Sequence, residues 1–139
     1  MNAKWQTVWR KGIAPQLDRH GIEELRIALI IDDSRLIQGT TTCPNIMDHN
    51  PGRACEAGCG IAFPIWQADT EQDIHDISEK FSLVCDKCDA DLLNATGDEV
   101  ACRFFINWFD DTPRQIMRKL LLDEVELWLA EHPKEEEPT

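Results

Sequence analysis

Apolar residues recur at helical spacing along much of this chain, and the clearest case is the stretch 113–130. Pro113 at a first helical position, with Thr112 before it and Gln115 three residues after Thr112, predicts a capped helix start. Apolar side chains then cover most of the helix circumference and leave only a narrow polar strip near Lys119, Asp123 and Glu126. A helix this apolar lies in the core or keeps one face for another chain, and the core is the commoner outcome.

Two stretches in the second half of the chain are also predicted to be helical. Residues 70–92 carry apolar side chains in steps of three and four with acids on the opposite face, and Asp69 or Thr70 is the expected cap. Residues 98–109 are rich in strand formers but show no alternation of period two. The absence of that alternation favours a buried helix.

Two short helices are expected near the N-terminus. The first surrounds Trp5–Trp9 and is interrupted by Gly12 and Pro15, because glycine and proline both weaken a helix interior. The second covers 22–31, where the apolar spacing is again helical. Together with the three helices above, they predict a mainly α protein of about five helices.

The pattern dissolves between residues 39 and 60, where glycine, proline and asparagine are too frequent for a long regular element. We expect an irregular loop rich in Cys, Gly and Pro there, followed by a brief strand at 61–66, so that the β content is small. Residues 1–131 are predicted to form one compact domain, since their length suits a single core. Residues 132–139 are predicted to be an acidic, disordered tail.

The charge of the chain is strongly negative and unevenly distributed. The formal net charge is −12. Residues 1–31 contain five basic and three acidic side chains, whereas residues 69–99 contain two basic and ten acidic ones. Such a field repels phosphate backbones and attracts basic proteins, so we expect no direct nucleic-acid binding and a protein partner that is basic. An acidic surface that is merely solvated explains the same composition.

The chain carries no stretch typical of export or of membrane insertion. Its first twelve residues lack a long apolar run, and the longest apolar stretch, residues 27–31, is far too short to span a bilayer. We therefore expect a soluble cytoplasmic protein without a membrane partner. In a reducing cytosol, its six cysteines are expected to be thiols or metal ligands rather than disulfides.

Two closely spaced cysteine pairs suggest a structural zinc site. Cys55 and Cys59 lie in the irregular loop, and Cys85 and Cys88 follow in the predicted helix over 70–92. Pairs of this spacing let both sulfurs reach one ion, and two pairs supply four thiolates to a tetrahedral zinc ion at about 2.3 Å. The predicted metal ligands are therefore Cys55, Cys59, Cys85 and Cys88.

Other interpretations of the cysteines stay open. Cys85 and Cys88 continue an apolar stripe and are equally explained as buried thiols, and Cys102 is more readily explained as a core residue still. A local ligand set within the loop is the second metal hypothesis, with an oxygen donor from Asp48: Cys43, His49, Cys55 and Cys59. Disulfide exchange at Cys85-Asp86-Lys87-Cys88 is disfavoured, since neighbouring acids are expected to raise the pKa of the thiols.

Glu124 falls within the apolar arc of the helix over 113–130. A carboxylate there is paired, metal-bound, shifted upward in pKa or placed at the rim with its head in water. The rim is the commonest of these, so Glu124 is a weak functional candidate.

The sequence names no reaction. Nucleophile-elbow, zinc-protease and phosphate-loop motifs are absent. We therefore expect a small acidic accessory or protein-interaction module that is stabilised by zinc, and a homo-oligomer stays open. The alternatives are a small metal-dependent enzyme and an acidic regulator of a basic nucleic-acid-binding protein.

Overall fold

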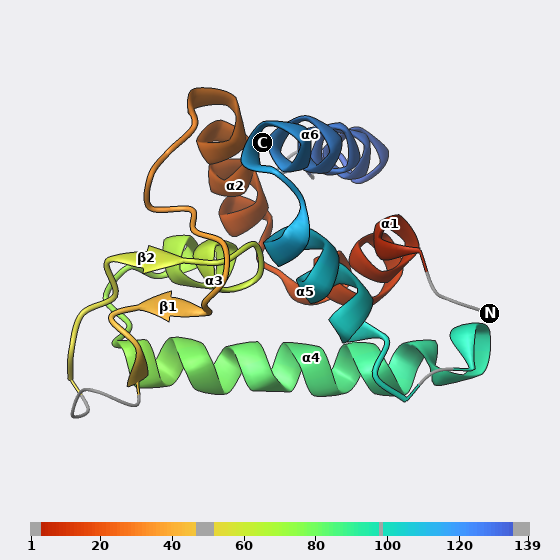
Figure 1. Cartoon of the computed structure of the whole chain (residues 1–139), viewed down its shortest axis with the longest axis horizontal. Coiled ribbons are helices and arrows are strands. Elements are labelled where there is room, and N and C mark those ends of the chain that lie inside the picture. Colours follow the sequence, from red (N-terminus) through yellow and green to blue (C-terminus); the bar gives the residue numbers. More distant parts are fainter. Residues whose placement is uncertain (1–3, 47–51, 98, 135–139) are drawn as a thin grey trace, which may run out of the picture.

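The computed structural model describes residues 4–46, 52–97 and 99–134, and these fold into helices around one core (Figure 1). The elements follow in the order α1 (Trp5–Thr7), a π-helix (Val8–Ile13), a 3₁₀-helix (Ala14–Gln16), α2 (Arg19–Ile31), β1 (Thr42–Cys43), β2 (Ala57–Gly58), α3 (Ala62–Ala68), α4 (Ile74–Thr96), α5 (Cys102–Asp111) and α6 (Arg114–Glu131). The predicted fold class, a mainly α single domain with a small β element, is confirmed.

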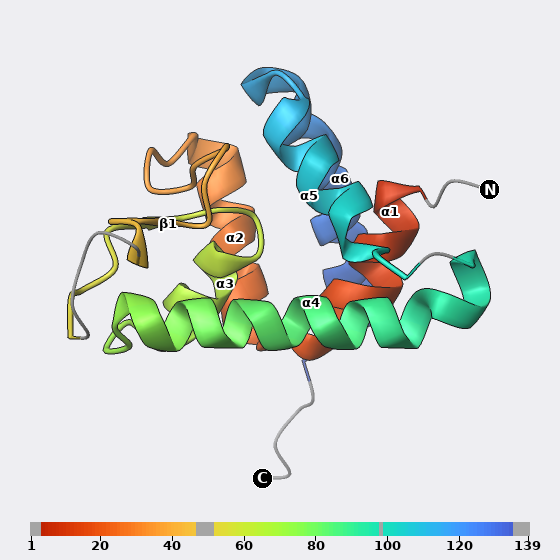
Figure 2. The ribbon, with the colours of Figure 1, turned by 60° about the horizontal axis from the view of Figure 1, so that its bottom comes forward.

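The long helix α4 runs along one side of the molecule, and the other helices stack across it (Figures 1 and 2). The π-helix, α3 and α5 contact α4 directly. Helix α2 packs on α3 and on α6, so that α2 and α6 lie next to each other on the side away from α4. Among the described residues, no helix is both long and apolar enough to cross a bilayer.

The N-terminal segment is helical without a break, although its hydrogen-bond pattern changes twice. The chain passes through Gly12 as a π-helix, and Pro15 lies in the 3₁₀-helix that follows. The prediction that Gly12 interrupts the helix is therefore wrong. Helix α2 begins at Arg19 instead of Ile22, since the Asp18 side chain accepts a hydrogen bond from the His20 backbone N–H.

The segment predicted as a strand at 61–66 is helix α3. The Phe63 N–H donates to the Cys59 carbonyl at 2.8 Å, which starts the helical turn. Pro64 lies in the first turn, where its missing N–H costs no intrahelical hydrogen bond. The only strands among the described residues are the antiparallel pair β1 and β2, in which Thr42 faces Gly58.

Two predicted helix caps are also wrong. Helix α4 is capped by Asp73, in a capping box with Asp76, and not by Asp69 or Thr70. Helix α6 begins at Arg114 after Pro113, and no side-chain capping hydrogen bond forms at that start, so Thr112 is not the cap.

Helix α6 has one buried face instead of being enclosed by the core. Met117, Leu121 and Val125 are buried, whereas large apolar side chains elsewhere on the helix are exposed: Ile116, Leu120 and Leu127. The expected enclosure of this helix in the core is therefore not found. After α6, His132–Lys134 are exposed. Residues 135–139, most of the predicted tail, lie outside the described residues, so the domain boundary stays a prediction.

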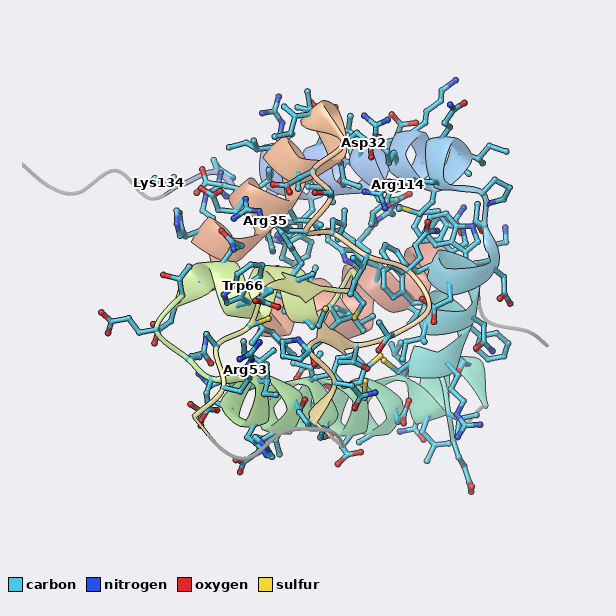
Figure 3. The ribbon with its side chains drawn as sticks, turned by 60° about the vertical axis from the view of Figure 1, so that its left-hand side comes forward. Asp32, Arg35, Arg53, Trp66, Arg114 and Lys134 are labelled. Atoms are coloured by element: carbon cyan, nitrogen blue, oxygen red, sulfur yellow. The ribbon has the colours of Figure 1, made fainter. Side chains whose placement is uncertain are left out.

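Helix α6 also holds the C-terminal end of α2. Arg118 donates to the carbonyls of Leu29 and Ile30, at 2.9 and 3.0 Å. Arg114 pairs with Asp32, which has a left-handed backbone at the end of α2 (Figure 3). Cations at this end of a helix satisfy its unpaired carbonyls and oppose its negative dipole. These contacts fix α2 against α6.

Candidate functional site

The six cysteines occupy different environments. Three lie before α3, and the other three lie on α4 and α5. Cys43 is exposed on β1, while Cys55 and Cys59 are buried. The Cys55 thiol donates to the Ala57 carbonyl at 3.2 Å, and the Cys59 sulfur accepts from the Ala62 N–H at 3.4 Å. Burial raises the pKa of Cys55, and it raises the pKa of Cys59 to about 11. Both are protonated, unreactive thiols at neutral pH.

The remaining three cysteines form a cluster between α4 and α5, which we call the thiol cluster: Cys85, Cys88 and Cys102. The Cys102 and Cys85 sulfurs are 3.2 Å apart. Cys85 is half-buried, whereas Cys88 and Cys102 are buried. The prediction that Cys102 is a core residue is confirmed, and its neighbour in that core is a thiol.

Two local features bring Cys102 to α4. Helix α4 ends at Thr96, and the left-handed backbone of Gly97 (φ 72°), which follows it, turns the chain back. The Asp89 carboxylate, four residues beyond Cys85 on α4, then accepts a hydrogen bond from the Cys102 N–H at 2.8 Å. A carboxylate at a helix N-terminus is favoured by the helix dipole, so Asp89 anchors the start of α5 beside the thiols.

The hydrogen bond from Cys102 controls the protonation of the cluster. It lowers the pKa of Cys85, although burial and the nearby Asp89 and Asp86 carboxylates act in the opposite direction. The same hydrogen bond to Cys85, together with one to Cys88, raises the pKa of Cys102. Asp86 and Asp89 thus act in the predicted direction, but the hydrogen bond from Cys102, which the sequence did not predict, outweighs them. Cys85 is the member of the pair that loses its proton first.

The structure does not arrange these cysteines as a metal centre. Within 4–46, 52–97 and 99–134, no group of three or more His, Cys, Asp or Glu side chains is placed to hold a metal ion. The predicted ligands Cys55, Cys59, Cys85 and Cys88 are all described and do not form such a group here. In the second set, Asp48 and His49 lie outside the described residues. Zinc binding itself stays a prediction.

Glu124, the other candidate, is paired. Its carboxylate accepts from Arg10 of the π-helix, with the closest nitrogen and oxygen 2.6 Å apart, and its side chain is 14% exposed. This hydrogen bond raises the pKa of Arg10. Glu124 is therefore a paired carboxylate and does not lie at the rim with its head in water. The ion pair joins α6 to the N-terminal helices.

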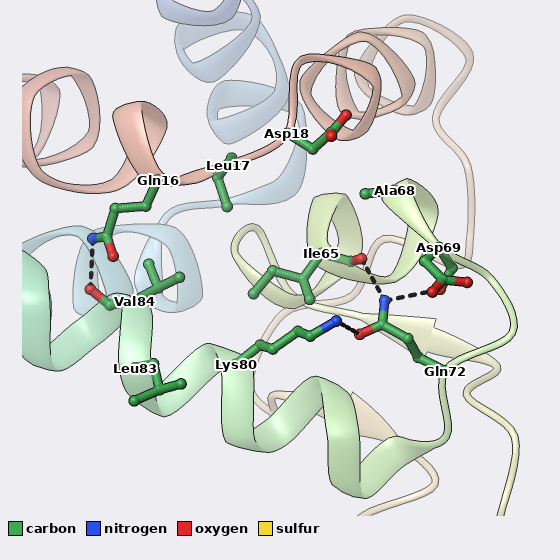
Figure 4. Close-up of a pocket in the computed structure, with 10 residues that line it drawn as sticks. All are labelled: Gln16, Leu17, Asp18, Ile65, Ala68, Asp69, Gln72, Lys80, Leu83 and Val84. Carbon is green, nitrogen blue, oxygen red and sulfur yellow. Dashed lines mark hydrogen bonds between the residues drawn. The ribbon is translucent and has the colours of Figure 1, made fainter.

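A groove of about 400 Å³ lies between α3, α4 and the segment 16–18 (Figure 4). The Gln72 amide donates to the carbonyls of Ile65 and Asp69, and its oxygen accepts from Lys80 at 2.5 Å. Gln16 donates to the Val84 carbonyl at 2.8 Å on the other side. These amides bond to the walls of the groove, so they serve to hold its elements together.

Six large apolar side chains are exposed on the adjacent helices α2 and α6. On α2 they form what we call the isoleucine face: Ile27, Ile30 and Ile31. Ile31 is the most exposed of the three, at 63%, and it lies four residues from Ile27 on the same side of the helix. The buried residues of α2, such as Leu25 and Leu29, lie on its other side in the core. The isoleucine face therefore contributes little to the core.

No protein family model matches this chain, and no curated protein or solved structure is significantly similar to it. Its function is therefore inferred from its own residues and their geometry.

Proposed function

We propose that this chain is a small acidic interaction module that binds a basic protein through the isoleucine face of α2. The observation that carries the proposal is the exposure of three isoleucines on one helix, between 45% and 63% for each side chain. Single exposed apolar residues are ordinary, but a contiguous group of them on a monomer is typical of a binding surface. The three isoleucines of α2 lie on one side of that helix and are of this second kind.

The position of the face supports a partner protein. Arg114 and Arg118 fix the end of α2 against α6, so Ile30 and Ile31 are presented on a well-anchored helix terminus. A surface that is rigid before binding loses less entropy when the partner arrives. The half-buried Leu122 of α6 lies beside Ile30 and extends the apolar surface toward α6.

The charge of the chain decides which partner is favoured. A second copy would bring another net charge of −12, and the two copies would repel each other. A basic protein is attracted by the same field and gains in association rate. Glu23 and Glu24 lie on α2 near Ile27 but beside Arg19 and His20, so the attraction comes from the net charge of the whole chain. These charges support a basic partner over self-association.

Position-specific photocrosslinking in a native extract tests this function. We expect a chain with a photoreactive residue at Ile31 to crosslink to a protein of basic sequence. The matched control carries the same residue at Leu83, which is 61% exposed on α4, and should not capture that protein. With the purified partner, Ile31→Asp should weaken binding about tenfold or more, since losing a central apolar anchor costs at least about 1.4 kcal/mol.

Three results would contradict the proposal. They are equal capture from Ile31 and Leu83, capture of a second copy of this chain only, and a purified partner whose affinity is unchanged by added salt or by Ile31→Asp. The Leu83→Asp variant, measured in the same titrations, controls for the added negative charge.

A structural zinc ion remains a separate part of the proposal. To share one ion, Cys55 would have to leave the Ala57 carbonyl and Cys85 would have to leave Cys102. Elemental analysis of protein purified without added metal, with thiol titration in denaturant before and after chelation, tests this. One zinc per chain, with four thiols released by the chelator, is the expected result. Folded protein without zinc and with six free thiols would contradict it.

A further inference from the structure

We propose that the thiol cluster is a site of thiol–disulfide exchange, in which Cys85 attacks a low-molecular-weight disulfide and Cys102 then closes a Cys85–Cys102 disulfide. The proposal is independent of the interaction face. It concerns the zinc-free protein, because Cys85 and Cys88 are also predicted zinc ligands. Glutathione disulfide is the probe that represents this class of oxidant.

The first argument is distance. The Cys85 and Cys102 sulfurs are 3.2 Å apart, and a disulfide bond is about 2.05 Å long. The two atoms therefore have to approach by only about 1 Å, which side-chain rotation and a small shift of the α5 N-terminus can supply. The two residues come from different helices, so the bond would join α4 to α5.

The second argument is access. Cys85 is the only half-buried member of the thiol cluster, and Cys88 and Cys102 have exposed fractions of 0% and 2%. A reagent in solution therefore reaches Cys85 first. Cys102 is protected from the same reagent but lies in contact with the sulfur that the reagent modifies. This is the arrangement of an attacking thiol and a resolving thiol.

The third argument is the hydrogen bond within the pair. Cys102 donates its S–H to the Cys85 sulfur, so the more exposed sulfur is also the one that accepts the hydrogen bond. The thiolate is the nucleophile in disulfide exchange, and a hydrogen bond of this direction favours negative charge on the accepting sulfur.

The exchange then proceeds in two steps. The Cys85 thiolate attacks one sulfur of the disulfide, forms a Cys85–glutathione mixed disulfide and releases one glutathione thiolate. Cys102 gives its proton to water and attacks the Cys85 sulfur, which releases the second glutathione thiolate. In total, two protein thiols are oxidised to one disulfide, and one glutathione disulfide is reduced to two glutathione molecules.

The test uses the full chain after chelation, with Cys43 replaced by serine throughout because Cys43 is exposed and would react independently. Each protein is incubated with glutathione disulfide, quenched by alkylation and mapped by mass spectrometry. We expect the parent protein to accumulate the Cys85–Cys102 disulfide. Cys102→Ser should stop at the Cys85–glutathione adduct, and Cys85→Ser should lose both products. Cys88→Ser is the matched control and should still form the Cys85–Cys102 disulfide.

Circular dichroism and urea unfolding of each variant establish that it is folded. If Cys102→Ser is unfolded, the comparison of Cys85→Ser with Cys88→Ser decides alone, because only the first should lose the product. A stable Cys85–glutathione adduct in the parent protein would overturn the proposal. A Cys85–Cys88 disulfide, or a folded parent protein that glutathione disulfide leaves unmodified, would overturn it equally.

Discussion

Replacing Gly21 with alanine is expected to lower the free energy of unfolding by about 2–3 kcal/mol. A Cβ atom at Gly21 would lie 2.2 Å from the Pro64 carbonyl oxygen and 3.0 Å from its carbon. Both atoms belong to the backbone of α3, so neither can rotate away as a side-chain end would. The two helices must separate where α2 packs on α3, and the intrinsic helix preference of alanine returns at most about 1 kcal/mol.

Urea unfolding of Gly21→Ala beside Gly97→Ala measures this effect. Gly97 is the matched control because a Cβ there meets no atom within 4 Å, although its φ of 72° is unfavourable for alanine. The control should lose only about 1 kcal/mol, which is the cost of a left-handed residue with a side chain. A loss at Gly21 no larger than the loss at Gly97 would show that α2 and α3 are not in backbone contact.

Periodicity alone located the long helices but not their ends. The apolar steps of three and four identify α4 and α6, because a buried face repeats over several turns. The cap of α4 depends on another segment: Asp73 accepts from the Gly52 N–H at 2.9 Å, and the Ile74 N–H donates to the Arg53 carbonyl. Asp69 and Thr70 are equally good caps by residue type, and this contact with the preceding loop, together with the capping box with Asp76, distinguishes Asp73.

Helix α3 could not be separated from a strand for a related reason. Its apolar run is short, and a short apolar run has no period that distinguishes the two structures. The Cys59 carbonyl starts the helix, and the close approach of Gly21 to Pro64 holds it against α2. The second of these contacts joins residues far apart in the chain and is invisible to a local pattern.

For the cysteines, the sequence predicts which side chains are buried but not which of them lie next to each other. The apolar stripe correctly predicts that Cys88 is buried, and the burial of Cys102 was also expected. Their proximity depends on the reversal at Gly97 and on the Asp89 hydrogen bond to the start of α5. Counting nearby acids predicts the wrong direction for the pKa of Cys85, because the hydrogen bond from Cys102 outweighs them.

A second large effect is expected where the π-helix meets the thiol cluster. A Cβ at Gly12 would lie 2.5 Å from the Cys88 sulfur and 2.8 Å from a terminal methyl carbon of Leu92. Leu92 can change its rotamer, but the Cys88 sulfur is fully buried. Gly12→Ala should therefore cost about 1–3 kcal/mol of unfolding free energy through overpacking.

The double variant Gly12→Ala/Cys88→Ala separates overpacking from other causes. Cys88→Ala removes the sulfur and should cost about 1 kcal/mol, close to the value for one buried methylene-sized group. It also makes room for the Cβ at position 12. The double variant should therefore lose less unfolding free energy than the two single variants lose together, by about 1 kcal/mol or more.

Gly12→Ala/Leu36→Ala is the control, since Leu36 is buried beside Gly58 and is not among the closest neighbours of a Cβ at position 12, and its two effects should add. Urea unfolding of the single and double variants measures all of these terms. Additive losses for Gly12 and Cys88 would show that the sulfur does not limit the space there. A loss of several kcal/mol for Cys88→Ala alone would instead favour a zinc ligand at that position, because a structural zinc ion contributes folding energy directly.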